Sequence, residues 1–404
     1  MEKNLKYNIL LCGLVLYVLA CLDMFAPKFI PIDATQFKAM QSVLFVFLVL
    51  LSGTEQIKKN IYFKAYFIII LGICISVFMA SSMHEEQSII ESIRATLPRL
   101  FVYSTFFLLC KIRPDAAFVE KMIFVLGFAS ALQVIQIWYL FPNPIFGSFS
   151  VDPVRGIRMT ALGDTFKVCL LFFSLNMMLI KFNKKHLIIF IICIISVILG
   201  IVRQIILILT CLTFLFAFNK MSLVKKVLFC SVFLVVLHFA AESETYQASK
   251  TYTENEIENQ NGENIRITAA RYYINDAQVN IFTRIFGNGC FAETSAYGAK
   301  ALSMQEKNRC YPTDVGLAYF YHVYGVLGIG GLFIMFWITW KLQVPFRFMY
   351  LKYTVYYMIL ASIASGPNLY YSQCILFPFI CYLLGEVYQS GAYSESMIEV
   401  NNHG

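Results

Sequence analysis

The sequence predicts an all-α polytopic membrane protein with about twelve transmembrane helices. The 404 residues are 59% hydrophobic and only 14% charged, with a mean hydropathy of +0.67. Soluble proteins average about 25% charged residues, so this composition exceeds what a soluble core needs. Each helical span takes roughly 20 apolar residues, and the chain divides into a series of such runs.

The apolar runs are separated by polar connections. The first run is interpreted as a span and not as a signal peptide, because another span follows it instead of a soluble mature domain. When residues 187–218 are counted as two short spans, the predicted spans are 5–22, 37–53, 62–80, 97–110, 117–141, 159–180, 187–202, 203–218, 223–241, 325–340, 348–365 and 373–388.

Basic residues gather in alternate connections, which predicts the orientation of the chain. Short cytoplasmic loops carry an excess of Lys and Arg, so both termini are expected in the cytoplasm. The net charge of +8 is explained by this distribution and not by a nucleic-acid partner. The basic segments hold Lys3 and Lys6; Lys58, Lys59 and Lys64; Lys111, Arg113 and Lys121; Lys181, Lys184 and Lys185; Lys220, Lys225 and Lys226; Lys341, Arg347 and Lys352.

Four regions follow from this pattern. Residues 1–241 hold spans one to nine, and residues 313–390 hold the last three. Between them, residues 242–312 form one large extracytoplasmic loop that is expected to contain short helices after a mobile acidic stretch. Residues 391–404 are a cytoplasmic tail.

Arg203 lies in the apolar stretch "ILGIVRQIILIL", which has lysines at both ends. A single crossing cannot have both ends in the cytoplasm, so residues 187–218 are predicted to form a hairpin that turns near Gly200–Arg203 at the outer face. Arg203 either snorkels to lipid headgroups or has a function, because a charge within the hydrocarbon is costly and usually functional. Gln204 is the other polar residue at this apex.

Further arginines are expected on the outer side. Residues 141–164 contain three prolines and three glycines, which forbid a simple helix, and they carry Arg155 and Arg158. In the large loop, Arg266 shares one expected helix face with Ala270 and Tyr273, and Arg271 lies on a neighbouring face. The turn "FGNG" (286–289) follows, and its glycines permit close backbone approach. Arginine forks bind phosphate oxygens in two-pronged fashion, so these four arginines and Arg203 are predicted to bind a lipid-linked diphosphate.

Asp314 precedes span ten in "YPTDVG". Two interpretations stay open: it caps the following helix, or it is a catalytic carboxylate that accepts a proton from an attacking hydroxyl. His322 lies about two turns deeper, where a packing role is preferred, and His322, Asn288 and Gln204 are secondary candidates for the site.

The cysteines and histidines indicate neither a metal site nor a redox motif, because the sequence lacks CxxC spacing and His/Cys clusters. Most cysteines lie in apolar segments, where they are expected to pack as small hydrophobic residues. Cys290 and Cys310 share the extracytoplasmic loop, and a disulfide between them is one prediction.

Three motifs together resemble the Wzy-type polymerases of bacterial O-antigens, capsules and exopolysaccharides, in the wider group that includes O-antigen ligases. They are "RGIRMTALGD" before a span, "GIVRQ" at the tip of a short hairpin, and "FGNG" followed by "PTDVGLAYFYHVYGVLGIGGL". The resemblance covers the whole chain in topology and these patches in motif. Ligases of this group typically have a His-Asn pair where this chain has "PTDVG", which favours a polymerase.

The resemblance implies a glycosyltransferase of GT-C-like architecture that joins repeat units carried on undecaprenyl diphosphate at the outer face of the bacterial inner membrane. Transfer would proceed with inversion, without a metal or other cofactor, and Asp314 and Arg203 would be catalytic. The implied partners are undecaprenyl-diphosphate-linked glycans, membrane lipid and a chain-length regulator protein. An O-antigen ligase and a non-enzymatic lipid-linked oligosaccharide flippase are the alternatives. A flippase must present its site to both sides, whereas the charges here collect on one.

Overall fold

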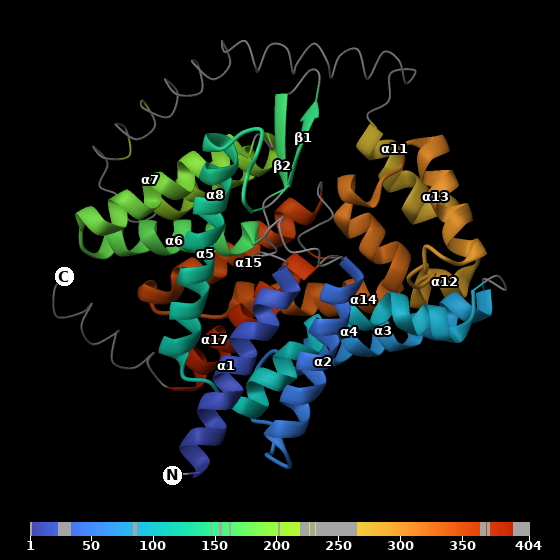
Figure 1. The fold of residues 1–404 in the computed structure, drawn as a ribbon, viewed down its shortest axis with the longest axis horizontal. Coiled ribbons are helices and arrows are strands. Elements are labelled where there is room, and N and C mark those ends of the chain that lie inside the picture. Colours follow the sequence, from blue (N-terminus) through green and yellow to red (C-terminus); the bar gives the residue numbers. More distant parts are fainter. Residues whose placement is uncertain are drawn as a thin grey trace.

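Helices make up nearly all of the part of the chain that the structure describes, and they pack side by side around a buried centre (Figure 1). One two-stranded antiparallel hairpin is the exception in that part. The computed structural model describes residues 2–22, 34–83, 87–146, 148–152, 156–160, 163–200, 203–218, 265–363 and 372–390, with residues 226, 231 and 369.

Five helices among these residues are long and apolar enough to cross a membrane. They identify the protein as a helical membrane protein, since a span takes roughly 20 residues. Twelve spans and the predicted orientation stay predictions. The five are α1 (Glu2–Leu22), α3 (Phe63–Met83), α4 (Ile89–Ile112), α5 (Ala116–Tyr139) and α14 (Gly316–Lys341).

The remaining predicted runs are also helical over most of their described residues, although 159–160 belong to a strand, and only residues 226 and 231 of the run 223–241 are described. Separate helices on either side of residues 200–202 confirm that 187–218 is not one continuous helix. Sixteen residues of helix rise about 24 Å, so α7 and α8 are short for a span. The helices are α2 (Ala34–Ser52), α6 (Asp164–Ile180), α7 (Lys184–Leu199), α8 (Arg203–Phe218), α15 (Met349–Ile363) and α17 (Leu376–Gln389).

Two helices define the core. In α17, every residue from Leu376 to Leu384 is buried, so apolar side chains on all its faces pack against neighbouring helices. The backbones of α14 and α3 approach closely through glycines: a Cβ on Gly72 would lie 3.3 Å from the Gly328 nitrogen. Small residues at such contacts are typical of helix packing in membranes.

The segment 141–164 does not form a simple helix, as its prolines and glycines predict. Strands β1 (Ser148–Asp152) and β2 (Gly156–Thr160) pair antiparallel, with Ser150 opposite Arg158. This hairpin connects α5 to α6, and it departs from a strictly all-α fold.

The predicted short helices are present in the described part of the large loop. They are α11 (Ile265–Arg271), a π-helical turn η1 (Tyr272–Asp276), α12 (Ile281–Phe286), α13 (Ala296–Asn308) and a 3-10 turn η2 (Pro312–Asp314); two further 3-10 turns, η3 (Phe346–Phe348) and η4 (Ser372–Ile375), precede α15 and α17. The acidic stretch that opens the loop lies outside the described residues.

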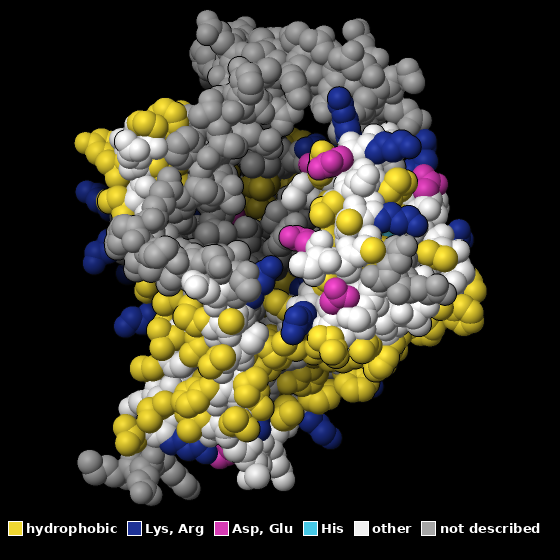
Figure 2. Space-filling view, turned by 45° about the vertical axis from the view of Figure 1, so that its right-hand side comes forward, with side chains coloured by type: hydrophobic (Ala, Val, Ile, Leu, Met, Phe, Trp, Pro, Cys, Tyr) yellow, Lys and Arg dark blue, Asp and Glu magenta, His cyan; other side chains and the backbone are white. Residues whose placement is uncertain are grey.

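One face of the molecule carries an apolar belt next to a region rich in charged side chains. Figure 2 shows charged side chains on the side of α11–α13, above a belt of hydrophobic side chains. Helix α12 lies at this boundary with Ile281 and Phe282 61% and 55% exposed. An exposed apolar face on a short helix is typical of a segment that rests on the membrane surface.

Candidate functional site

Arg266 and Arg271 line one pocket, as the prediction of a shared phosphate site requires. Both belong to α11, five residues apart, and the pocket has a volume of about 410 Å³. Val315 at the start of α14 and Ile363 at the end of α15 form the facing walls. We call this the arginine pocket; its other lining residues are Ile267, Ala270, Ile274 and Asn275.

Asp314 immediately precedes Val315 of the arginine pocket and is partly buried. Its backbone N–H donates to the Tyr311 carbonyl at 3.1 Å, which closes the turn η2. The N-cap position of α14 is occupied by Val315, one residue after Asp314, and both interpretations of the Asp314 carboxyl stay predictions. The turn brings a carboxyl-bearing residue to the segment that borders the two arginines.

His322 lies deeper in the same helix and contacts Asn288, so the structure brings these two secondary candidates together. The separation of His322 Nδ1 and Asn288 Nδ2 is 3.1 Å. The imidazole is buried and lies against the rings of Tyr273 and Tyr319, with centroid distances of 5.3 and 5.8 Å. Val315, Tyr319 and His322 follow the spacing of one helix face, which runs from the arginine pocket into the protein.

Three potential acceptors surround the amide nitrogen of Asn288. The Asn288 amide nitrogen also lies 3.2 Å from the Ala277 carbonyl and 3.1 Å from Gln278 Oε1, both of which accept hydrogen bonds. An amide nitrogen carries two hydrogens, so it can donate to two of these three neighbouring groups, and the proton position on His322 depends on whether Nδ1 is one of them. A flipped amide would place its oxygen against two other acceptors.

The "FGNG" turn fits against a kink in α14. Gly325 has a positive φ of 63° inside the helix, and the turn donates to carbonyls just before this break. Asn288 N–H bonds the His322 carbonyl at 2.8 Å, and Gly289 N–H bonds the Val323 carbonyl at 3.0 Å. A Cβ on Gly287 would collide with the same Val323 carbonyl oxygen, so the predicted close backbone approach is confirmed.

The other predicted phosphate-binding residues lie on separate elements. Arg158 belongs to β2 and Arg203 begins α8, but their side chains, and all of Arg155, lie outside the described residues. Gln204 follows in α8 and is partly buried. Figure 1 places β1–β2 and α8 apart from α11–α13, so convergence of Arg155, Arg158 and Arg203 on the arginine pocket stays a prediction.

An ion pair that the sequence analysis overlooked lies at the start of α6. Lys167 Nζ and Asp164 Oδ1 are 2.7 Å apart, with side chains 5% and 30% exposed. The Asp164 carboxylate acts electrostatically on the fully buried Tyr357, whose hydroxyl has no hydrogen-bond partner among the residues that the structure describes. A lysine inside "TFKVCLLFF" was the available signal, since the rule that identified Arg203 applies equally to it.

A second overlooked cation lies midway along α4. Arg99 is partly buried, and its Nη1 donates to the Ala95 carbonyl at 2.6 Å. Pro98 precedes it within the helix and removes one backbone donor. The carbonyl that Pro98 leaves without a backbone donor is that of Arg94, four residues before it, so the bond from Arg99 to Ala95 is a separate contact along the same helix.

The predicted disulfide between Cys290 and Cys310 is not formed. Both residues are buried, but Cys290 Sγ lies 3.7 Å from Tyr324 Oη, whereas Cys310 accepts a hydrogen bond from Tyr273 at its carbonyl. Burial raises the pKa of the Cys310 thiol, and the Asp276 carboxylate raises this pKa further. The thiol is therefore held in its neutral, unreactive form.

Neither a protein-family model nor a curated protein sequence matches the chain.

Proposed function

We propose that the protein is a membrane-embedded glycosyltransferase of GT-C-like architecture. It polymerises oligosaccharide repeat units carried on undecaprenyl diphosphate at the outer face of the bacterial inner membrane. The observation that carries the proposal is the arginine pocket, in which Arg266 and Arg271 flank one cavity beside the Asp314 segment. Permanent cations at this position suit a diphosphate, because guanidinium groups bind phosphate oxygens in two-pronged fashion.

In the proposed reaction, a hydroxyl oxygen of the incoming unit attacks the anomeric carbon of the growing chain. The new C–O bond forms as the bond to the diphosphate breaks with inversion, and the electron pair leaves with undecaprenyl diphosphate. Asp314 accepts the hydroxyl proton, and the arginines stabilise the negative charge that develops on the leaving group.

The charged region above the apolar belt supports this assignment over transport. A lipid-linked substrate keeps its chain in the bilayer and its diphosphate at the headgroup level, where the belt meets the charged side chains (Figure 2). The described cations of the arginine pocket lie on one loop, whereas a transporter presents its site to both sides of the membrane in turn.

The first test replaces the arginines in protein reconstituted with a lipid-linked repeat unit. Arg271→Ala should lower turnover by about 10²–10³, the usual loss for one charge-stabilising donor, and should weaken donor binding. Arg284→Ala is the matched control, because Arg284 is exposed on the same loop and does not line the pocket. Equal activity of both variants would contradict the proposal.

The second test separates the carboxylate from the cations. Asp314→Asn should leave donor binding intact and lower turnover by about 10²–10⁴, the range for a general base. In cells, deletion of the gene should remove long polysaccharide chains while single-unit chains persist. Loss of all attached chains would indicate a ligase or a flippase instead.

A further inference from the structure

The short helix α12 and the two residues before it expose apolar side chains and bury a polar one. Val279, Ile281, Phe282 and Ile285 are between 38% and 61% exposed, whereas Thr283 among them is fully buried. We call these four exposed residues the apolar face of α12. Surfaces in contact with water show the reverse distribution, and a contiguous apolar patch marks a contact with a protein or a membrane.

Polar contacts on the inner side of α12 fix this arrangement. The Asn280 side chain accepts hydrogen bonds from the N–H groups of Phe282 and Thr283 at 2.9 and 3.0 Å, and Asn280 N–H bonds Thr283 Oγ1 at 3.1 Å. This capping box begins the helix. At the other end, a Cβ on Gly325 of α14 would collide with the Ile285 carbonyl. The helix is therefore held closely on α14 with its apolar face outward.

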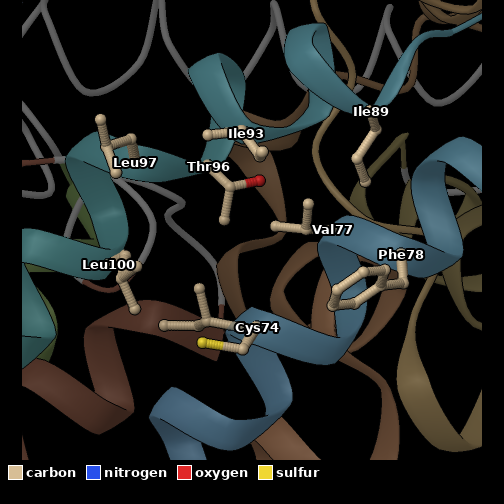
Figure 3. Close-up of a pocket in the computed structure, with 9 residues that line it drawn as sticks. Cys74, Val77, Phe78, Ile89, Ile93, Thr96, Leu97 and Leu100 are labelled. Carbon is tan, nitrogen blue, oxygen red and sulfur yellow. The ribbon is translucent and has the colours of Figure 1, made fainter.

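The apolar face lies at the level where two apolar helices end. Asn280 Nδ2 is 3.3 Å from the sulfur of Met83, the last residue of α3. Phe78, about 7.5 Å earlier along the same helix axis, is 65% exposed at the rim of an apolar groove between α3 and α4. Figure 3 shows Ile89, the first residue of α4, on the same side of this groove. Exposed apolar side chains on a span contact lipid, so the hydrocarbon reaches the ends of both helices and α12 lies at its edge.

A lipid surface is the partner that this position favours. The apolar belt in Figure 2 reaches the side of α11–α13, where charged side chains begin. A helix at such a boundary buries its apolar side by about 5–10 Å in the region between headgroups and acyl chains. The rest of the loop stays in water. The apolar face of α12 thus continues a surface that already contacts lipid, whereas a protein partner would have to displace lipid at its edge.

We propose that the apolar face of α12 is a membrane-binding surface that anchors the outer loop to phospholipid at the boundary of headgroups and acyl chains. The inference does not depend on the proposed reaction, because no catalytic residue takes part in the contact. It bears on the position of the arginine pocket, because α12 and the turn η1, which continues α11, both pack on α14.

Photoreactive phospholipids measure this contact and its depth. The full-length protein is reconstituted in vesicles of phosphatidylethanolamine and phosphatidylglycerol that contain a phospholipid with a diazirine either near the carboxyl end or at the methyl end of one acyl chain. Labelled residues are then mapped by mass spectrometry. Residues 279–286 should be labelled mainly by the first probe. Leu71, which is exposed in the middle of α3, should be labelled mainly by the second.

Three variants test the contribution of the face. Phe282→Asp should lower labelling of residues 279–286 about tenfold or more, a change that corresponds to about 1.4 kcal/mol of lost apolar contact. Phe282→Trp should retain the labelling. Leu302→Asp is the matched control, because Leu302 is exposed on α13 of the same loop and lies outside the apolar face. Unchanged labelling of Leu71 in each variant shows that the protein is folded and inserted.

Three outcomes would overturn the proposal. The first is a wild-type protein in which Leu71 is labelled and residues 279–286 are not. The second is labelling of these residues that persists in Phe282→Asp, and the third is equal labelling by the methyl-end probe, which would place the segment within the hydrocarbon. A photoreactive benzoylphenylalanine in place of Phe282 adds one more arm: cross-links to phospholipid support the proposal, whereas a covalent dimer would show that a second copy of the chain covers the face.

Discussion

Individual side chains in the outer loop are held by neighbours that lie far away in the sequence. Asn288 fixes the orientation of His322 across 34 residues, and Tyr273 bonds the carbonyl of Cys310 across 37. Neither contact has a local sequence signal, because each depends on how the turn meets the kinked helix. The sequence could nominate His322 and Asn288 separately, but it could not pair them.

The first prediction for a single residue concerns the pH at which the Cys310 thiol becomes reactive. Because burial and then Asp276 raise its pKa, less thiolate exists at a given pH, and alkylation should begin at higher pH than for an ordinary thiol near 8.5. Asp276→Asn should move this onset only partly back, since burial is the larger cause. Iodoacetamide labelling across pH, read at the Cys310 peptide, measures it; an onset at or below that of a free thiol would contradict the burial argument.

The ion pair in α6 gives a second residue-scale prediction. Lys167→Met should destabilise the protein by about 3 kcal/mol, because it leaves the Asp164 charge without its partner in a mostly buried position. Adding Asp164→Asn should recover much of this loss. Lys58→Met is the control, since the Lys58 side chain that pairs with Glu386 is 39% exposed, against 5% for Lys167, and a pair with an exposed cation contributes about 1 kcal/mol or less.

Thermal unfolding in nanodiscs compares these variants. If Lys167→Met is no more harmful than Lys58→Met, the α6 pair is effectively solvated and the cost assigned to its burial is incorrect.

At the scale of elements, the kink in α14 and the "FGNG" turn form one unit. Gly287 has a φ of 83°, and its missing Cβ leaves room for the Val323 carbonyl. Gly287→Ala should therefore destabilise the protein by about 2–4 kcal/mol through backbone strain and overpacking. Gly330→Ala, in α14 beyond the kink, should be neutral or should stabilise the protein by up to about 1 kcal/mol, because nothing lies within 4 Å of the position of its added Cβ.

The two alanine variants can be compared by their midpoint of thermal unfolding and by trypsin sensitivity of the outer loop. Similar stability for both would mean that the turn moves away from the helix at little cost, and that the unit is not rigid.

At the scale of the whole molecule, the apolar runs predicted the helices well, because hydropathy reports directly on burial in lipid. The break at Gly200–Arg203 and the irregular segment 141–164 were also predictable, from the charge pattern and from proline and glycine. The π-helical turn after Arg271, the kink at Gly325 and the β-hairpin register were not, since tertiary packing determines them. Lys167 was also predictable, because it is a charged residue inside an apolar run.

The prediction for the whole molecule concerns its orientation in the membrane. The turn at Glu293–Thr294 should face the outside and the turn at Thr54–Glu55 the cytoplasm, and both are exposed. Epitope tags inserted at each turn and stained in spheroplasts should be visible without permeabilisation for the first and only after permeabilisation for the second. The opposite result would place the arginine pocket inside the cell and remove its access to exported glycans.

The apolar face of α12 bears on how a polymer grows. A helix that rests on the lipid surface fixes the height of the arginine pocket above the bilayer, so the pocket always meets the sugar nearest the carrier. Under the proposed reaction, every round of elongation then has the same geometry, whether the donor carries a short chain or a long one. Such an enzyme has no internal means of counting. Under the proposed reaction, polymer length is then set outside the pocket, which is the role that the predicted chain-length regulator would have.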